Sequence, residues 1–152
     1  MKYIKPVRII DCSKNITNID NFFLDFPDQI ELIAHKLMHF SGDGYVILDF
    51  GKEYSGGIKI FSMYIAKNST IRIRFGESVG ETCSDIGYKG ATNDHSPRDF
   101  EVKIPLLCGL NFGETGFRFV RIDFKGEFWD LRNIVAAVNN DEREEIGTFK
   151  CD

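Results

Sequence analysis

The stretch "IRIRFGE" at residues 71–77 decides the fold class of this chain. Its apolar residues Ile71, Ile73 and Phe75 alternate with Arg72 and Arg74. Because successive side chains of a β-strand point to opposite faces, this alternation predicts a half-buried strand with one solvated face.

The segments that follow repeat the two-residue period. "FEVKIPLL" at 100–107 predicts a strand with three inward apolar residues, Val102, Ile104 and Leu106. Pro105 indicates a strand end or an edge strand, since proline has no backbone donor. In "GFRFVRIDF" at 116–124 the apolar phase slips by one residue, which predicts a β-bulge near Phe119–Val120.

Three further segments read as strands: "YVILDF" at 45–50, "GGIKIFSMYI" at 56–65 and "LRNIVAAV" at 131–138. "PDQIELIAHKLMHF" at 27–40 fits either a helix or a strand at 29–33, and the strand is favoured because its neighbours are strands. With 14 Phe for the core and no long helical pattern, the chain is predicted to be all-β, an antiparallel β-sandwich.

The composition narrows the range of functions that this chain could have. A chain of 152 residues fits one domain, 1–152, in which 1–43 contributes the less regular strands. The net charge of −4 and the lack of a basic run disfavour nucleic acid as a binding partner. No apolar stretch is long enough to span a membrane. The four cysteines are far apart, which predicts free thiols and a cytoplasmic location: Cys12, Cys83, Cys108 and Cys151.

Two features within the strands have predictable roles. Asp49 lies in a strand that is otherwise apolar on both faces, so its carboxylate should be paired or should cap a turn. Arg118 and Arg121 could pair with Glu77 or Asp123 or could contact another domain, and the ordinary cross-strand pair is favoured.

Three blocks, in this order, carry a family resemblance: "VILDFGKEYSGGIKI" (46–60), "IRIRFGES" (71–78) and "TGFRFVRID" (115–123). Together they resemble the concanavalin-like, jelly-roll β-sandwich that precedes the catalytic barrel of bacterial α-L-rhamnosidases, the glycoside hydrolase family 78-like enzymes. The similarity covers residues 44–150. "EIGTFKCD" at 145–152 resembles the segment that leads into the helical (α/α)₆ barrel.

The resemblance implies a non-catalytic accessory domain that supports the barrel and shapes its sugar pocket, because the family's catalytic residues lie in the barrel. Its expected partners are a rhamnose-containing glycan or the catalytic barrel, and a homodimer stays open. The alternative is an autonomous carbohydrate-binding module.

The loop "ATNDHSPRD" at 91–99 and one tryptophan supply the candidate carbohydrate or domain-interface contacts: Asn93, Asp94, His95, Arg98, Asp99 and Trp129. A polar loop held by its own hydrogen bonds is the favoured interpretation, and the rim of a sugar pocket is the second. No catalytic residue and no cofactor are assigned, although the oxygen ligands of this loop would suit Ca²⁺. Trp129 could stack on a sugar or pack in the core.

Overall fold

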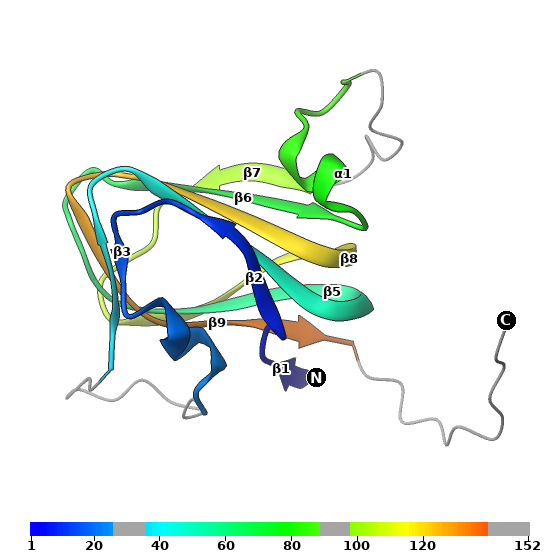
Figure 1. Ribbon diagram of the computed structural model, residues 1–152, viewed down its shortest axis with the longest axis horizontal. Coiled ribbons are helices and arrows are strands. Elements are labelled where there is room, and N and C mark those ends of the chain that lie inside the picture. The colour runs from blue at the N-terminus through cyan, green and yellow to red at the C-terminus, as the bar shows by residue number, and fades with distance from the viewer. Residues whose placement is uncertain (26–35, 89–97, 140–152) are drawn as a thin grey trace, which may run out of the picture.

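Two long strands, β5 (Gly44–Ile65) and β8 (Cys108–Lys125), organise the computed structural model, which describes residues 1–25, 36–88 and 98–139 (Figure 1). They pair antiparallel along their lengths, from Gly44 opposite Phe124 to Ser62 opposite Cys108. Both strands bend at the same end of the molecule, so each contributes one half to each of two layers (Figure 1).

The first layer contains the N-terminal half of β5, the C-terminal half of β8, and β2 (Arg8–Cys12), β6 (Thr70–Gly76) and β7 (Asp99–Val102). The second contains the other halves of β5 and β8, with β1 (Lys2–Ile4), β3 (Ile16–Thr17), β4 (Met38–Ser41) and β9 (Phe128–Val138). A 3₁₀ turn, η1 (Ile19–Phe23), and a short helix, α1 (Val79–Cys83), complete the elements. The predicted antiparallel sandwich, of jelly-roll type, is confirmed.

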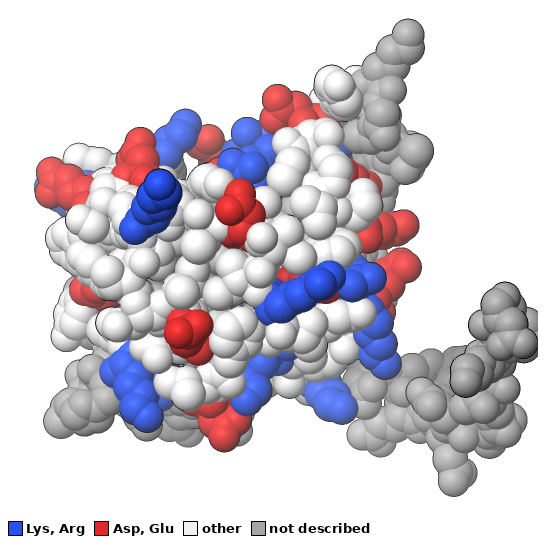
Figure 2. Space-filling view, in the orientation of Figure 1, with Lys and Arg blue, Asp and Glu red and all other residues white. Residues whose placement is uncertain are grey.

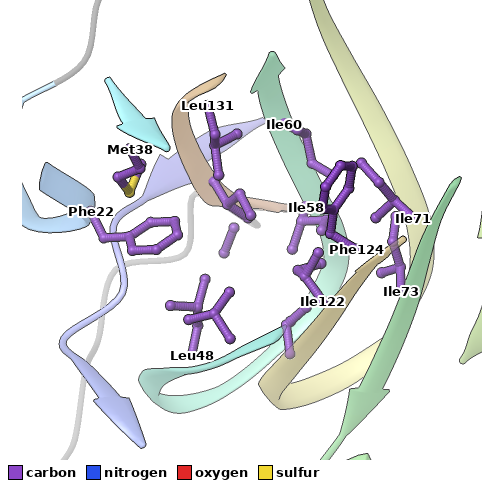
Figure 3. Packing of buried hydrophobic residues seen from close by; sticks show 14 of the residues in the cluster. Phe22, Met38, Leu48, Ile58, Ile60, Ile71, Ile73, Ile122, Phe124 and Leu131 are labelled. Atoms are coloured by element: carbon purple, nitrogen blue, oxygen red, sulfur yellow. The ribbon is translucent and has the colours of Figure 1, made fainter. Parts of the chain in front are cut away.

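The core lies between the layers (Figure 3). Six strand residues that the alternation predicts to be inward are at most 1% exposed: Ile71, Ile73, Phe75, Phe117, Ile122 and Phe124. Figure 3 shows β6 and β8 side chains meeting those of β5 and β9 across this space. Burial of this apolar surface, at about 25 cal/mol per Å², is the main favourable term in folding.

The phase slip in β8 lies one step earlier than the sequence predicts. Phe117 and Val120 both belong to the core, whereas Phe119 between them points to the outer face of the first layer. The irregularity in the β5–β8 register coincides with it, since Asp49 lies opposite Phe119 while Tyr54 lies opposite Phe117. The slip is therefore part of the bend that carries both strands from one layer to the other.

Two expected strand features differ in the structure. β7 ends at Val102, ahead of Pro105, and Leu106 is 55% exposed, so the prediction that Leu106 points inward is wrong. Pro105 has no backbone N–H to donate, so the hydrogen bonding between β7 and β6 does not continue past this point. β7 is an edge strand, at the end of the strand order. The proposed strand at 29–33 and the segment 145–152 lie outside the described residues. Within the described part, no helix is long and apolar enough to cross a membrane.

The bend depends on paired glycines. A Cβ on Gly57 would lie 2.2 Å from the carbonyl oxygen of Gly113, and one on Gly56 would lie 2.3 Å from that of Ala137. Gly56 also has a φ of +147°. At this point β5 is held between β8 and β9, so both flanking backbones approach too closely for a side chain.

Replacement of Gly57 by Ala should therefore destabilise the fold by about 1–3 kcal/mol or more, because the contact is with backbone that cannot move aside cheaply. Urea unfolding followed by far-ultraviolet circular dichroism measures this. Gly80 in α1 is the matched control, since its Cβ would meet nothing closer than 3.9 Å. Gly80→Ala should be neutral or stabilising, and equal losses in both variants would contradict the close-packing explanation.

Candidate functional site

The outer face of the first layer carries rows of opposite charges. The register places Arg74 of β6 between Arg121 of β8 and Asp99 of β7. In the next row Arg72 lies between Asp123 and Glu101. Side chains directly opposite in antiparallel strands lie on one face, so these six strand positions form a continuous polar surface.

A groove of about 250 Å³ runs along this surface. Three strands line it with seven residues: Thr70, Arg72, Arg74, Glu101, Arg121, Asp123 and Lys125. The groove is slightly smaller than the usual range for small-molecule sites, roughly 300–1,000 Å³. On the face of the molecule shown in Figure 2, basic and acidic side chains are likewise interspersed, with no broad patch of one sign.

Asp123 connects the two central arginines of the groove. Its carboxylate accepts hydrogen bonds from Arg74 Nη2 at 2.7 Å and from Arg121 Nη2 at 2.7 Å. Burial acts to raise the pKa of the Asp123 carboxyl, but the hydrogen bonds from Arg121 and Arg74 outweigh it and hold the pKa below its ordinary value. Asp123 therefore stays ionised and fixes both guanidinium groups.

Arg72 is held by Asp99 of β7. It donates from Nε to Asp99 Oδ1 at 2.7 Å and from Nη2 to Asp99 Oδ2 at 2.5 Å, the bidentate geometry in which Arg–carboxylate pairs are strongest. A third bond runs to Asp85 at 2.7 Å. The hydrogen bond to Asp99, followed by that to Asp85, raises the pKa of Arg72. Its partner Asp85 has a lowered pKa through the hydrogen bond from Arg72.

The outward side chains of β6 are less solvated than their alternation predicts. Arg74 is only 5% exposed. The helix α1 lies beside β6, and the carbonyl oxygen of Cys83 at its end accepts from Arg74 Nη1 at 3.2 Å. Ser78 caps α1 by accepting from the backbone N–H of Glu81. The Ser-x-x-Glu spacing of a helix start was present in the sequence and would have revealed this helix.

The predicted site residues Arg98 and Asp99 have separate partners. Arg98 is 1% exposed and donates from Nη1 to the backbone carbonyl of Glu81 at 3.0 Å. Its Nε and Nη2 make no hydrogen bond within the described residues. Asp99, by contrast, pairs with Arg72 beside the groove. Their role as carbohydrate or interface contacts stays a prediction, and Asn93, Asp94 and His95 lie outside the described residues.

Trp129 is fully buried and donates from Nε1 to Ser62 Oγ at 2.8 Å. Its ring packs against Phe40 and Phe124, with ring centroids 5.2 Å and 5.7 Å away. The core interpretation of this residue fits the structure, and neither face of the indole is open to a sugar. The described residues contain no cluster of three or more potential metal ligands, and a Ca²⁺ site involving residues 93–94 stays a prediction.

Asp49 forms a second charge cluster, at the bend. Its buried carboxylate accepts from Arg8 Nε at 2.8 Å and from Arg118 Nε at 2.9 Å, and it also accepts from the backbone N–H of Gly51 at 2.7 Å. The prediction that Asp49 is paired or caps a turn is confirmed in both respects: the arginines pair with it, and the bond from Gly51 caps the turn that follows. Arg118 thus pairs with Asp49, while Arg121 pairs with Asp123 on its own strand instead of across strands.

The sequence did not reveal the groove as a unit, although it placed Arg72 and Arg74 on a solvated face and indicated Asp123 as a partner of Arg121. The signal was the alternation of charged residues on two strands. What was missing was the register between β6, β7 and β8, which depends on contacts between distant segments.

Comparison with known structures identifies the architecture. A rhamnosidase from Klebsiella oxytoca with rhamnose bound superimposes with a TM-score of 0.61 at 16% identity, covering 90% of this chain and 28% of that chain. The CBM32 of AlyQ in complex with 4,5-unsaturated mannuronic acid matches with a TM-score of 0.57 at 13% identity, covering 90% and 98%. The Streptococcus pneumoniae fucose binding module SpX-3 matches with a TM-score of 0.55 at 10% identity, covering 92% and 100%.

The chain spans about 28% of the length of that rhamnosidase. No protein-family profile matches the sequence. No curated protein matches it either. The chain therefore shares the fold of β-sandwich domains from rhamnosidases and carbohydrate-binding modules, at low sequence identity.

The Asp49 cluster generates a pH prediction. The hydrogen bond from Arg118, with further bonds from Gly51 and Arg8, outweighs the opposing effect of burial and lowers the pKa of Asp49 from 3.8 to about 2. Because the folded-state pKa is depressed, its stabilisation is present above the unfolded value, about 3.9, and is lost as the pH falls toward 2. Asp49→Asn should remove roughly 2 kcal/mol at pH 7.

Urea unfolding of both proteins between pH 7 and pH 2.5 tests this, and the difference between them should shrink below about pH 4. Glu127→Gln, at an exposed position, is the control and should change stability by no more than about 0.5 kcal/mol. A difference between Asp49→Asn and the unmodified protein that does not depend on pH would contradict the role assigned to the carboxylate.

Proposed function

We propose that this chain is a non-catalytic, carbohydrate-contacting β-sandwich domain of an α-L-rhamnosidase-like glycoside hydrolase. The groove on the first layer is its sugar-facing surface, and the domain supports a catalytic (α/α)₆ barrel and shapes its pocket. Two observations support the parentage: the order of the three sequence blocks within 46–123, and a fold match to a rhamnosidase that covers 90% of this chain.

The groove carries the proposal because its chemistry suits a polyhydroxylated ligand. Sugar hydroxyls both donate and accept hydrogen bonds, and the groove alternates guanidinium donors with carboxylate acceptors over three strands. Arg72, Arg74 and Arg121 are each fixed by a carboxylate, so little side-chain freedom would be lost on binding. Lys125 and Glu101 have no ion pair within the described residues and are available to a ligand.

The same electrostatics argue against catalysis by the groove. A glycosidase needs one carboxyl group with a raised pKa to act as general acid. Asp123, a carboxylate of the groove, instead has a lowered pKa, because the hydrogen bonds from Arg121 and Arg74 outweigh the effect of its burial. This carboxylate is suited to orient arginines and to accept hydrogen bonds, and it is poorly suited to donate a proton.

An autonomous carbohydrate-binding module is the second candidate. The matches to the CBM32 module and to the fucose binding module cover 98% and 100% of those chains, so domains of this size and fold exist as separate modules. The rhamnosidase has rhamnose bound, the CBM32 module is in complex with 4,5-unsaturated mannuronic acid, and SpX-3 is a fucose binding module. Carbohydrate is accordingly the proposed partner of this chain as well.

Titration of the isolated chain with L-rhamnose and rhamno-oligosaccharides, followed by two-dimensional ¹⁵N NMR, tests the groove. Shifts should appear at groove residues of β6 and β8. Lys125→Met should weaken binding about tenfold or more, since hydrogen bonds to charged groups contribute about 1.5–3 kcal/mol. Its stability should not change, because Lys125 makes no ion pair in the described structure.

Lys103→Met, at an exposed position beyond the end of β7, is the matched control and should bind like the unmodified protein. The chain should release no product from an aryl α-L-rhamnoside, and turnover would overturn the non-catalytic role. A dissociation constant below about 1 mM, roughly −4 kcal/mol, would favour the autonomous module. Absence of any groove shift at saturating sugar would leave only a scaffolding function.

A further inference from the structure

The outer face of the second layer exposes two aromatic rings. Tyr64 of β5 is 44% exposed and Phe128 of β9 is 37% exposed. Trp129, which follows Phe128 in β9, is fully buried, and Met63, which precedes Tyr64 in β5, is 2% exposed. The outward positions of an antiparallel sheet are normally polar, so the sandwich itself does not account for these two rings.

A polar pair lies in the same row. Asp130 of β9 is opposite His39 of β4 on one side and opposite Tyr64 of β5 on the other. His39 Nδ1 lies 2.6 Å from Asp130 Oδ1. The side chains of His39 and Asp130 are 41% and 23% exposed. We call the four residues the aromatic patch: His39, Tyr64, Phe128 and Asp130.

The patch is ordered before any ligand arrives. The His39 ring stacks on Phe128 with centroids 6.4 Å apart and an interplanar angle of 17°. The bond to Asp130 uses only one nitrogen of the imidazole and one oxygen of the carboxylate. Nε2 of His39 and Oδ2 of Asp130 make no hydrogen bond within the described residues, so one potential donor or acceptor and one acceptor remain for a ligand.

We propose that the aromatic patch is a second saccharide-binding surface, separate from the groove. The apolar face of a sugar ring packs on exposed aromatic faces, while its hydroxyl groups require the convergent polar atoms that His39 and Asp130 supply. His39 and Tyr64 lie two strand spacings apart, about 9.5 Å, which matches the length of two sugar rings. A protein partner would need a larger surface, on the order of 1,000 Å², than these four residues provide.

The position of the patch gives it a distinct consequence. The groove lies on the outer face of the first layer and the patch on that of the second, so the sandwich separates them. A glycan cannot reach both surfaces through one sugar unit. The chain therefore presents two separate saccharide surfaces, and a polymeric glycan binds more tightly than its monosaccharide only where it is long enough to engage both at once.

Two-dimensional ¹⁵N NMR of the full chain, titrated with methyl α-L-rhamnoside and with rhamno-oligosaccharides, tests this inference. Ligand shifts are expected at residues 38–40, 63–65 and 128–131, apart from any shifts at the groove. Tyr64→Ala should weaken binding at the patch about five- to tenfold, and Tyr64→Phe, which keeps the ring, should retain it. Lys125→Met should leave the patch shifts unchanged.

Leu110→Ala is the matched control, because Leu110 is equally exposed, at 40%, but lies outside the patch. Several outcomes would overturn the proposal: no shift at the patch with any of these saccharides, equal losses in Tyr64→Ala and Leu110→Ala, or loss of binding together with loss of folding in Tyr64→Phe. Patch shifts that depend on protein concentration in the absence of sugar would assign the surface to a second copy of the chain. Groove shifts are read separately, so failure at the patch does not bear on the proposed function.

Discussion

The carboxylate of Asp49 joins three strands at the point where β5 leaves the first layer. It accepts hydrogen bonds from Arg8 on β2 and Arg118 on β8, and it also accepts from the N–H of Gly51 just beyond it in β5. A buried carboxylate without these donors would be costly, so the register between the strands and the start of the bend are fixed together. Because β5 and β8 serve both layers, the position of every other strand follows from this bend.

The groove uses the same kind of interaction for a different purpose. At the bend, Arg8 and Arg118 donate hydrogen bonds to the buried carboxylate of Asp49 and so connect β2 and β8 to β5. On β6, β7 and β8 the arginines and carboxylates are paired near the surface, where the side chains of Arg72 and Arg121 stay partly exposed while Arg74 is covered. The hydrogen bonds from Arg121 and Arg74 hold the pKa of Asp123 below its ordinary value, so this carboxylate stays ionised. An ionised, paired carboxylate accepts hydrogen bonds, as the proposed binding role requires.

The two outer faces of the sandwich differ in character. The outer face of the first layer carries arginines paired with carboxylates, whereas that of the second carries aromatic rings beside the His39–Asp130 pair. Both faces lie on strands whose inner residues build one core, so each surface is held rigidly without contributing to the packing that stabilises it. The two proposed recognition surfaces therefore use side chains other than those that build the core.

The sequence alone predicted the strand segments from residue 45 onward, the inner residues of β6 and β8, the need to pair Asp49 and the family-like order of the blocks. These are local properties, because the alternation of side chains with a period of two can be read from residues that are neighbours in the sequence. It did not determine that Arg72 would bind Asp99, that Arg98 would turn to α1, or that Leu106 and Tyr64 would be exposed while Arg74 was covered. Those outcomes depend on which distant strands become neighbours and where β5 and β8 bend, and register between segments far apart in the chain is decided only by tertiary packing.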